Sequence, residues 1–277
     1  MPTPNNHTVR RWEDVTPDLF NHEITARNEP AVLVGLVDHW PAVQYANRSD
    51  RKVCEYLAAL DSGALVESIM TPPEARGRIS YNDSITGFNY LRNQVTLTRV
   101  MEQVLRYALF PSPPAVAAQS APVISCLPGF LADHAMPLLP ATVQPRIWLG
   151  NRVITPAHID ESHNIACVVS GQRLFTLFPP EQGDNLYLGP RDLTPTGSPI
   201  SLVDFAQPDF ESFPNFRTAL AHAQVALLEP GDALYIPTGW WHHVQSLSDL
   251  NILVNYWWTV EQADLAKSAP LPPKTPG

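Results

Sequence analysis

The second half of the chain is a series of short apolar runs separated by turn residues. The runs cover residues 146–149, 164–169, 173–178, 224–228, 234–237, 240–244 and 250–258. Turn-forming residues follow most of them, as at Gly150, Gly171 and Pro230-Gly231-Asp232. Short strands with turn signals at this spacing are typical of a β-sandwich or a β-barrel. The pattern therefore predicts a mainly β fold in which strands far apart in the sequence meet.

The first half of the chain predicts a mixture of helices and strands. Apolar residues recur at helical spacing in residues 50–60 and again in residues 95–110, where Leu109 closes the apolar face. Apolar runs at residues 31–37 and 64–70 predict two strands, and Thr16-Pro17 predicts the capped start of a helix. These elements carry no catalytic cluster of their own.

We expect one domain over residues 1–268, because no internal repeat or boundary divides it. Residues 1–140 would form a mixed α/β N-terminal part packed on a barrel core at residues 141–258. Residues 259–268 are predicted to form a terminal helix and residues 269–277 a disordered tail. Residues 180–222, rich in proline, aspartate and phenylalanine, interrupt the strand series, and a loop of this size predicts a wall or lid over a site.

Composition narrows the class of partner and compartment. The formal charge is −9, and an acidic surface repels phosphate backbones, so no nucleic-acid partner is expected. The three cysteines form no C-x-x-C pair, which favours a reducing compartment. We see no secretory signal and no run of about 18 apolar residues, so we expect a cytoplasmic protein without a membrane partner.

Two short stretches together predict a metal site. His158 and Asp160 are two residues apart, and such residues point to the same face of an extended strand. A histidine pair, His242 and His243, follows a Pro/Gly turn and two tryptophans later in the chain. Neighbours on a strand face opposite sides, so only one of the pair can join the cluster, and the spacing does not choose between them. Two histidines and one carboxylate with open positions suit catalytic Fe(II) better than a closed structural zinc site.

One cation and several polar residues lie among the apolar strands near these ligands. Arg173 opens an apolar run, and a buried arginine needs an anionic partner, which a carboxylate can provide through two parallel hydrogen bonds. Thr155 could donate a hydroxyl to the same carboxylate. Asn164 and Asn255 must hydrogen-bond if buried. The alternatives are a structural ion pair or a position on an edge strand for Arg173, and turn or core-amide roles for the two asparagines.

These residues, taken in order, resemble the JmjC and cupin-like (cupin 8 type) oxygenases that depend on Fe(II) and 2-oxoglutarate. The resemblance is carried by His158-Ile159-Asp160, Trp241-His242, Thr155, Arg173 and residues 230–237, and it is densest over residues 145–258. The branch that it resembles most contains the asparaginyl hydroxylase of hypoxia-inducible factor. Residues 30–33 and 39–41 also resemble the N-terminal part of that family.

The resemblance implies a fold, a reaction and a set of site residues. The fold would be a double-stranded β-helix, the jelly-roll barrel of the cupins and JmjC proteins, with flanking helices. Iron would be bound by His158, Asp160 and His242. Thr155, Arg173, Asn164, Asn255 and Trp257 would form the cosubstrate pocket. With O₂ and 2-oxoglutarate, the enzyme would hydroxylate a protein side chain or a small amino-acid-like molecule and release succinate and CO₂. A homodimer is left open.

The sequence departs from the family at two points. Arginine stands at position 173 where the asparaginyl hydroxylase has lysine, and residues 115–120 lack the tyrosine that also holds the cosubstrate there; Gln119 or Ser120 would have to substitute. Two alternatives therefore stay open. One is a metal-cupin enzyme that does not use 2-oxoglutarate, and the other is a non-catalytic cupin-like binding protein.

Overall fold

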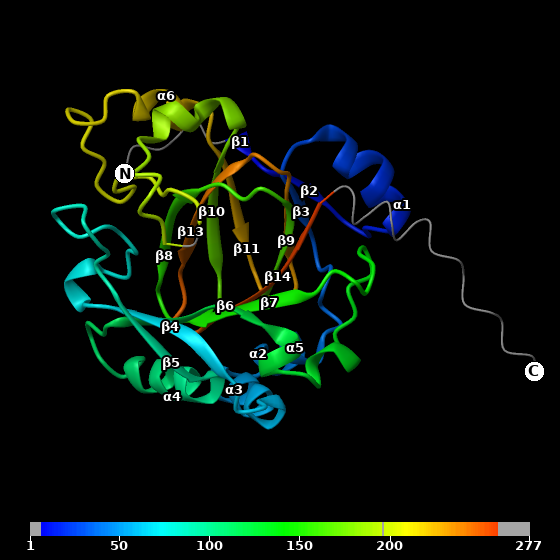
Figure 1. The fold of residues 1–277 in the computed structure, drawn as a ribbon. Coiled ribbons are helices and arrows are strands. Elements are labelled where there is room, and N and C mark those ends of the chain that lie inside the picture. Colours follow the sequence, from blue (N-terminus) through cyan, green and yellow to red (C-terminus); the bar gives the residue numbers. More distant parts are fainter. Residues whose placement is uncertain (1–6, 196, 260–277) are drawn as a thin grey trace, which may run out of the picture.

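Two β-sheets that face each other form the centre of the molecule (Figure 1). The computed structural model describes residues 7–195 and 197–259. The smaller sheet has the order β1 (His7–Thr8), β11 (Gln224–Leu228), β10 (Arg173–Phe178), β13 (Trp241–Ser246), β8 (Ile154–His158). The larger has the order β2 (Arg10–Trp12), β3 (Ala31–Leu33), β12 (Ala233–Ile236), β9 (His163–Ser170), β14 (Asn251–Trp258), β7 (Pro145–Gly150), β6 (Ala115–Pro122), β4 (Leu65–Thr71), β5 (Leu91–Thr96).

Strands β7 to β14 wind between the two sheets. Strands β7, β9, β12 and β14 belong to the larger sheet, and β8, β10, β11 and β13 belong to the smaller one. Neighbouring strands within this set pair antiparallel, as β14 with β7 and β9 illustrates. The predicted double-stranded β-helix with flanking helices is therefore confirmed.

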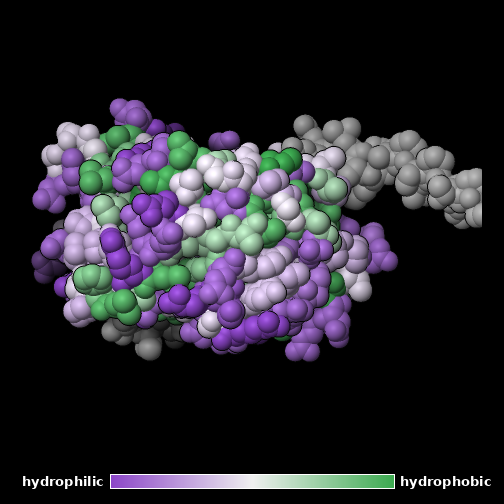
Figure 2. Space-filling view, turned by 90° about the horizontal axis from the view of Figure 1, so that it is seen from below, coloured by the Kyte–Doolittle hydropathy of each residue, from purple (hydrophilic) through white to green (hydrophobic). Residues whose placement is uncertain are grey.

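Helices of the N-terminal half cover the outer face of the larger sheet (Figure 1). They are α2 (Pro41–Ala46), α3 (Asp50–Leu60), α4 (Leu97–Tyr107) and α5 (Val123–Cys126). Ser49 and Thr96 start α3 and α4, because each side chain accepts a hydrogen bond from a backbone N–H of the first turn. The predicted helices are confirmed, but α4 ends before Leu109, which is 83% exposed. Seen from below, the molecule presents mainly hydrophilic side chains interspersed with hydrophobic ones (Figure 2).

The remaining helical segments are short. They are α1 (Pro17–Leu19), η1 (Phe20–Ile24), η2 (Thr25–Arg27), η3 (Pro73–Ala75), η4 (Phe130–Ala132), η5 (Pro180–Leu186) and α6 (Phe216–Ala221). Thr16 caps α1, as its position before Pro17 predicted. In the described part of the chain, no helix is both long enough and apolar enough to cross a bilayer.

The central strands of the larger sheet are buried on both faces, which explains their continuous apolar runs. On β9, Ile165 and Cys167 pack outward into the cluster that the helices complete. The alternate residues Ala166 and Val168 pack inward against the smaller sheet. One predicted strand is shorter in the structure. The strand predicted over residues 31–37 ends at Leu33, because Gly35 turns the chain at a φ of +63°.

Two parts of the predicted organisation need comment. Strands β5 and β6 were not predicted, because residues 91–96 are mainly polar and residues 115–122 are rich in alanine. The terminal helix expected at residues 259–268 and the tail at 269–277 lie, apart from residue 259, outside the described residues. The division of the chain at residue 140 stays a prediction.

Candidate metal centre

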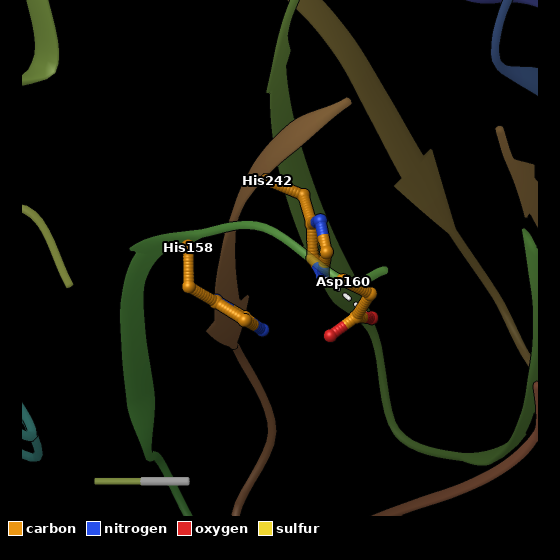
Figure 3. Close-up of side chains that lie close together, drawn as sticks. All are labelled: His158, Asp160 and His242. Atoms are coloured by element: carbon orange, nitrogen blue, oxygen red, sulfur yellow. Dashed lines mark ion pairs between the residues drawn. The ribbon is translucent and has the colours of Figure 1, made fainter. Parts of the chain in front are cut away.

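Three side chains meet at one end of the smaller sheet (Figure 3). His158 ends β8 and lies directly opposite His242 on β13, so both imidazoles project from the same face. Asp160 follows two residues after the end of β8. Potential ligand atoms of the three residues all lie within 4.8 Å of one another. The structure therefore brings together the trio that the sequence singled out, and their role as metal ligands stays a prediction.

The structure chooses between the two neighbouring histidines. The His243 ring is buried on the opposite side of β13, where it stacks on Phe205 with ring centroids 4.3 Å apart and planes 8° apart. It has no place in the cluster. His242 is also buried, but its Nε2 lies 3.5 Å from Oδ2 of Asp160.

Hydrogen bonds to the backbone orient both imidazoles of the cluster. Nδ1 of His158 lies 2.9 Å from the carbonyl oxygen of Pro156, and Nδ1 of His242 lies 3.1 Å from that of Trp240. A carbonyl can only accept, so Nδ1 is protonated in both rings, and Nε2 is the nitrogen left to bind a metal. Burial and the nearby His158 lower the pKa of His242 to about 4, although Asp160 opposes this shift. Neutral imidazole is the form that binds a metal.

A chain of side chains holds the Asp160 carboxylate. The indole Nε1–H of Trp257 donates to Oδ2 of Asp160 at 2.9 Å, and Nδ2 of Asn164 donates to the same oxygen at 3.4 Å. Asn255 donates to Asn164, and Trp148 donates to Asn255. Burial acts to raise the pKa of Asp160, but the neighbouring His242 and His158 together with these donors outweigh it and lower that pKa. Asp160 is thus kept as an ionised, oriented carboxylate.

This chain adds to the roles expected for Asn164, Asn255 and Trp257. The sequence assigned all three to the cosubstrate pocket. They do line the cavity beside the cluster, but every hydrogen bond given for their side chains belongs to the chain that ends on Asp160. Their first contribution is therefore to orient the carboxylate, a task that partners of metal ligands commonly have.

The cluster opens into a cavity between the two sheets. It has a volume of about 410 Å³, including space open to solvent. The lining residues come from both sheets: Trp148, Thr155, His158, Asp160, Asn164, Ala166, Arg173, Phe175, His242, Val244, Leu253, Asn255 and Trp257. All eight residues predicted for the site are among them.

Thr155 reaches this cavity because strand β8 is irregular. Residues three apart on a regular strand face opposite sides, yet Thr155 and His158 both line the cavity. The register between β8 and β13 shifts between the pair His158–His242 and the pair Thr155–Val244. The shift gives β8 one extra residue, next to Pro156, whose missing N–H suits an irregular position.

Arg173 is a buried cation without an anionic partner. It is 8% exposed, it forms no ion pair within the described chain, and its Nε has no hydrogen-bond partner. Burial lowers its pKa to about 10, so it stays charged at neutral pH. Among the described residues, the predicted alternative of a structural ion pair therefore finds no partner. An unpaired guanidinium in a mainly apolar cavity fits a carboxylate ligand, which is the group that 2-oxoglutarate would bring.

The insertion at residues 180–222 does not cover the cavity. It was predicted to form a wall or lid. Instead, Leu186, Val203 and Phe216 pack against Trp241 and its neighbours on the outer side of the smaller sheet. No described residue of this insertion lines the cavity. The physical reason is its aromatic content, which is buried against that sheet and not over the cavity.

The two residues expected to substitute for the missing tyrosine, Gln119 and Ser120, do not line the cavity. Both lie at an irregularity between β6 and β7, where Ser120 adopts a φ of +47°. The hydroxyl and carbonyl oxygens of Ser120 accept from Nε of Arg146. The sequence analysis did not select Arg146 as a site residue. The available signal was its spacing of two residues from Trp148, which places both side chains on the same face of β7.

Comparison with known proteins identifies the family. A model described as "Cupin-like domain" matches residues 17–264. Similar proteins include JmjC domain-containing protein F of Dictyostelium discoideum, 32% identical over 49% of this chain and 34% of that protein. Lysine-specific demethylase JMJ31 of Arabidopsis thaliana is 38% identical over 40% of this chain and 20% of that protein. The human bifunctional peptidase and (3S)-lysyl hydroxylase JMJD7 is 27% identical over 89% of this chain and 82% of that protein. The chain thus covers only a fifth to a third of the length of the first two of these relatives.

Proposed function

Because the chain belongs to the cupin-like domain family, we propose that it is an oxygenase that uses Fe(II), 2-oxoglutarate and O₂. The observation that carries the proposal is a pairing within one cavity. An open cluster of two histidines and one carboxylate lies in the same cavity as Arg173, a buried cation that forms no ion pair with any described residue. A metal with free positions and a site for an anion are what chelation of a 2-oxo acid requires.

The residues of the cavity would divide the work among them. His158, Asp160 and His242 would bind the iron and leave its other positions open. Arg173, with the Thr155 hydroxyl, would bind the distal carboxylate of 2-oxoglutarate and so fix its orientation. Phe175, Val244 and Leu253 line the cavity with apolar surface, which excludes water from the reaction.

When bound, iron and 2-oxoglutarate together supply the oxidising chemistry. O₂ is reduced, 2-oxoglutarate is converted to succinate and CO₂, and one oxygen atom is inserted into a C–H bond of the substrate. The chain contributes binding, orientation and shelter from water. Trp257 and Asn164 keep the Asp160 carboxylate in place during this cycle.

We propose that the hydroxylated group is a protein side chain or a small amino-acid-like molecule. The name of the human relative, a (3S)-lysyl hydroxylase, supports an amino-acid side chain as the target class. The match to that relative covers most of both chains, which gives it more weight than the shorter matches. We place the activity in the cytoplasm.

Turnover without a prime substrate tests the proposal. The full-length protein is incubated with Fe(II), ascorbate and 2-oxoglutarate labelled at its C1 carboxylate, in the presence and absence of O₂. We expect slow, O₂-dependent release of labelled CO₂, and its loss in His158→Ala. His222→Ala, a change at an exposed histidine outside the cavity, is the matched control and should retain the release. If metal binds and no label is released, the metal-cupin enzyme without 2-oxoglutarate replaces this proposal.

A further inference from the structure

A second arginine that forms no ion pair with any described residue lies next to the cavity, near the start of strand β7. Residues Arg146 and Trp148 are two apart on β7, so their side chains project from the same face. Trp148 lines the cavity, whereas the intervening Ile147 packs into the outer core. Arg146 is also the direct cross-strand partner of Asn255 on β14, and Asn255 lines the cavity as well. Arg146 therefore lies on the inner face, one step beyond the cavity wall.

The side chain of Arg146 is anchored at one atom only. Its Nε donates to the carbonyl oxygen of Ser120 at 2.8 Å and to the Ser120 hydroxyl at 2.7 Å. Ser120 presents both oxygens from a left-handed backbone conformation, with a φ of +47°, which a serine adopts rarely. An irregularity of this kind in a sheet commonly redirects a side chain, here that of Arg146. The anchor fixes the direction of the guanidinium.

The two terminal nitrogens of Arg146 are left for another partner. In residues 7–195 and 197–259, no carboxylate forms an ion pair with Arg146, and no hydrogen bond reaches its Nη1 or Nη2. The residue is partly buried, so it is less screened by water than a surface arginine. A guanidinium held by Nε presents its two Nη groups as a fork that matches a carboxylate.

We infer that Arg146 is a specificity-determining residue that binds a carboxylate of the prime substrate at the edge of the cavity. The inference rests on the proposed function, because it assumes that the substrate enters beside the metal cluster. Arg173 lies within the cavity and would be occupied by the cosubstrate, so a second carboxylate would be bound by Arg146. The carboxylate can come from an acidic side chain of a peptide or from the free carboxylate of an amino-acid-like molecule.

Calorimetric titration distinguishes these sources. The full-length protein, loaded with Zn(II) and 2-oxoglutarate, is titrated with capped heptapeptides of alanine and glycine that carry one glutamate at each position in turn. Matched peptides carry glutamine at the same position. A third arm uses N-acetylglutamate against its amide. For one of these ligands, we expect the carboxylate form to bind about tenfold more tightly than its matched amide, because a charge-assisted hydrogen bond to Arg146 adds about that much affinity.

Three variants complete the test. Arg146→Gln should abolish the preference, whereas Arg146→Lys should retain part of it because the charge is kept. Arg152→Gln removes an exposed arginine just beyond the opposite end of β7 and should leave the preference unchanged. Equal binding of carboxylate and amide forms to the wild type would overturn the inference, as would a preference that survives in Arg146→Gln.

A parallel measurement separates this inference from the proposed function. Wild type and Arg146→Gln are each titrated anaerobically with Fe(II) and 2-oxoglutarate. A visible charge-transfer band in both proteins supports the proposed function and confirms that Arg146→Gln is folded, whatever the peptides show. If the band is absent from both, the proposed function fails, and the calorimetric preference still decides whether Arg146 binds a carboxylate.

Discussion

Replacing Arg173 by methionine should change stability and ligand binding in opposite directions. Burial lowers the pKa of Arg173 to about 10, and the shift from the ordinary arginine pKa corresponds to a cost of about 3 kcal/mol for keeping the charge in the folded state. At neutral pH the guanidinium is charged in both the folded and the unfolded chain, so this cost lowers the free energy of unfolding. Arg173→Met removes the charge and keeps an unbranched side chain that adapts to the cavity.

We expect the ligand-free Arg173→Met protein to be more stable by about 1–3 kcal/mol. For a chain of this size, each kcal/mol raises Tm by about 2–4 °C. The affinity for 2-oxoglutarate should fall by about 10- to 150-fold, since losing a charge-assisted pair costs about 1.5–3 kcal/mol. Arg173→Lys keeps the charge and should lose less affinity. Arg152→Met, at an exposed arginine, is the control and should change neither quantity.

Thermal unfolding followed by circular dichroism, with calorimetric titration of 2-oxoglutarate in the presence of Zn(II), measures both effects. In the wild type, 2-oxoglutarate should raise Tm by pairing the buried charge, and this rise should be smaller in Arg173→Met. A variant that is less stable without ligand would contradict the claim that Arg173 lacks a partner. Unchanged affinity for 2-oxoglutarate would contradict its role in the cavity.

Three further predictions concern the carboxylate, a buried histidine and the core. Trp257→Phe removes the shorter of the two hydrogen bonds to Asp160 and should weaken Mn(II) binding about tenfold by calorimetry, whereas Trp12→Phe on the remote strand β2 should not. Burial lowers the pKa of His134 to about 4, against about 6.5 in the unfolded chain. The free energy of unfolding therefore has its full value above about pH 6.5, and it decreases by about 2–3 kcal/mol as the pH falls toward about 4, because the unfolded chain takes up a proton that the buried ring does not. Urea unfolding should show that His134→Gln removes this part of the pH dependence. Leu57→Ala, at a fully buried position on α3, should lower the free energy of unfolding by about 2–5 kcal/mol in the same assay, and a loss below about 1 kcal/mol would contradict the packing.

The metal cluster was predictable because its residue types and local spacing carry the signal. Asp160 follows His158 by two residues, so one short segment, the end of β8 and the loop residues directly after it, places them together. The choice of His242 was different. Spacing alone left His243 equally suitable, and it was the resemblance that favoured His242. In the structure, His243 stacks on Phe205 on the other side of β13, which leaves His242 as the histidine that faces Asp160.

What the sequence did not predict depends on contacts between distant segments. The chain from Trp148 to Asp160 joins three strands and one loop, so no local pattern announces it. The same holds for Arg146, whose anchor Ser120 lies on another strand. Residues 180–222 were expected to cover the cavity because long loops often do. Their aromatic side chains instead bury themselves on the outer side of the smaller sheet.

The central claim is that one cavity holds Fe(II) and 2-oxoglutarate together. Anaerobic titration of the metal-free protein with Fe(II) and then 2-oxoglutarate tests it most directly, because a visible metal-to-ligand charge-transfer band forms only when the 2-oxo acid chelates the iron. We predict this band in the wild type, its absence in His158→Ala and Asp160→Ala, and a requirement for more 2-oxoglutarate in Arg173→Met. A wild-type protein that binds Fe(II) tightly but gives no band at saturating 2-oxoglutarate would contradict the claim.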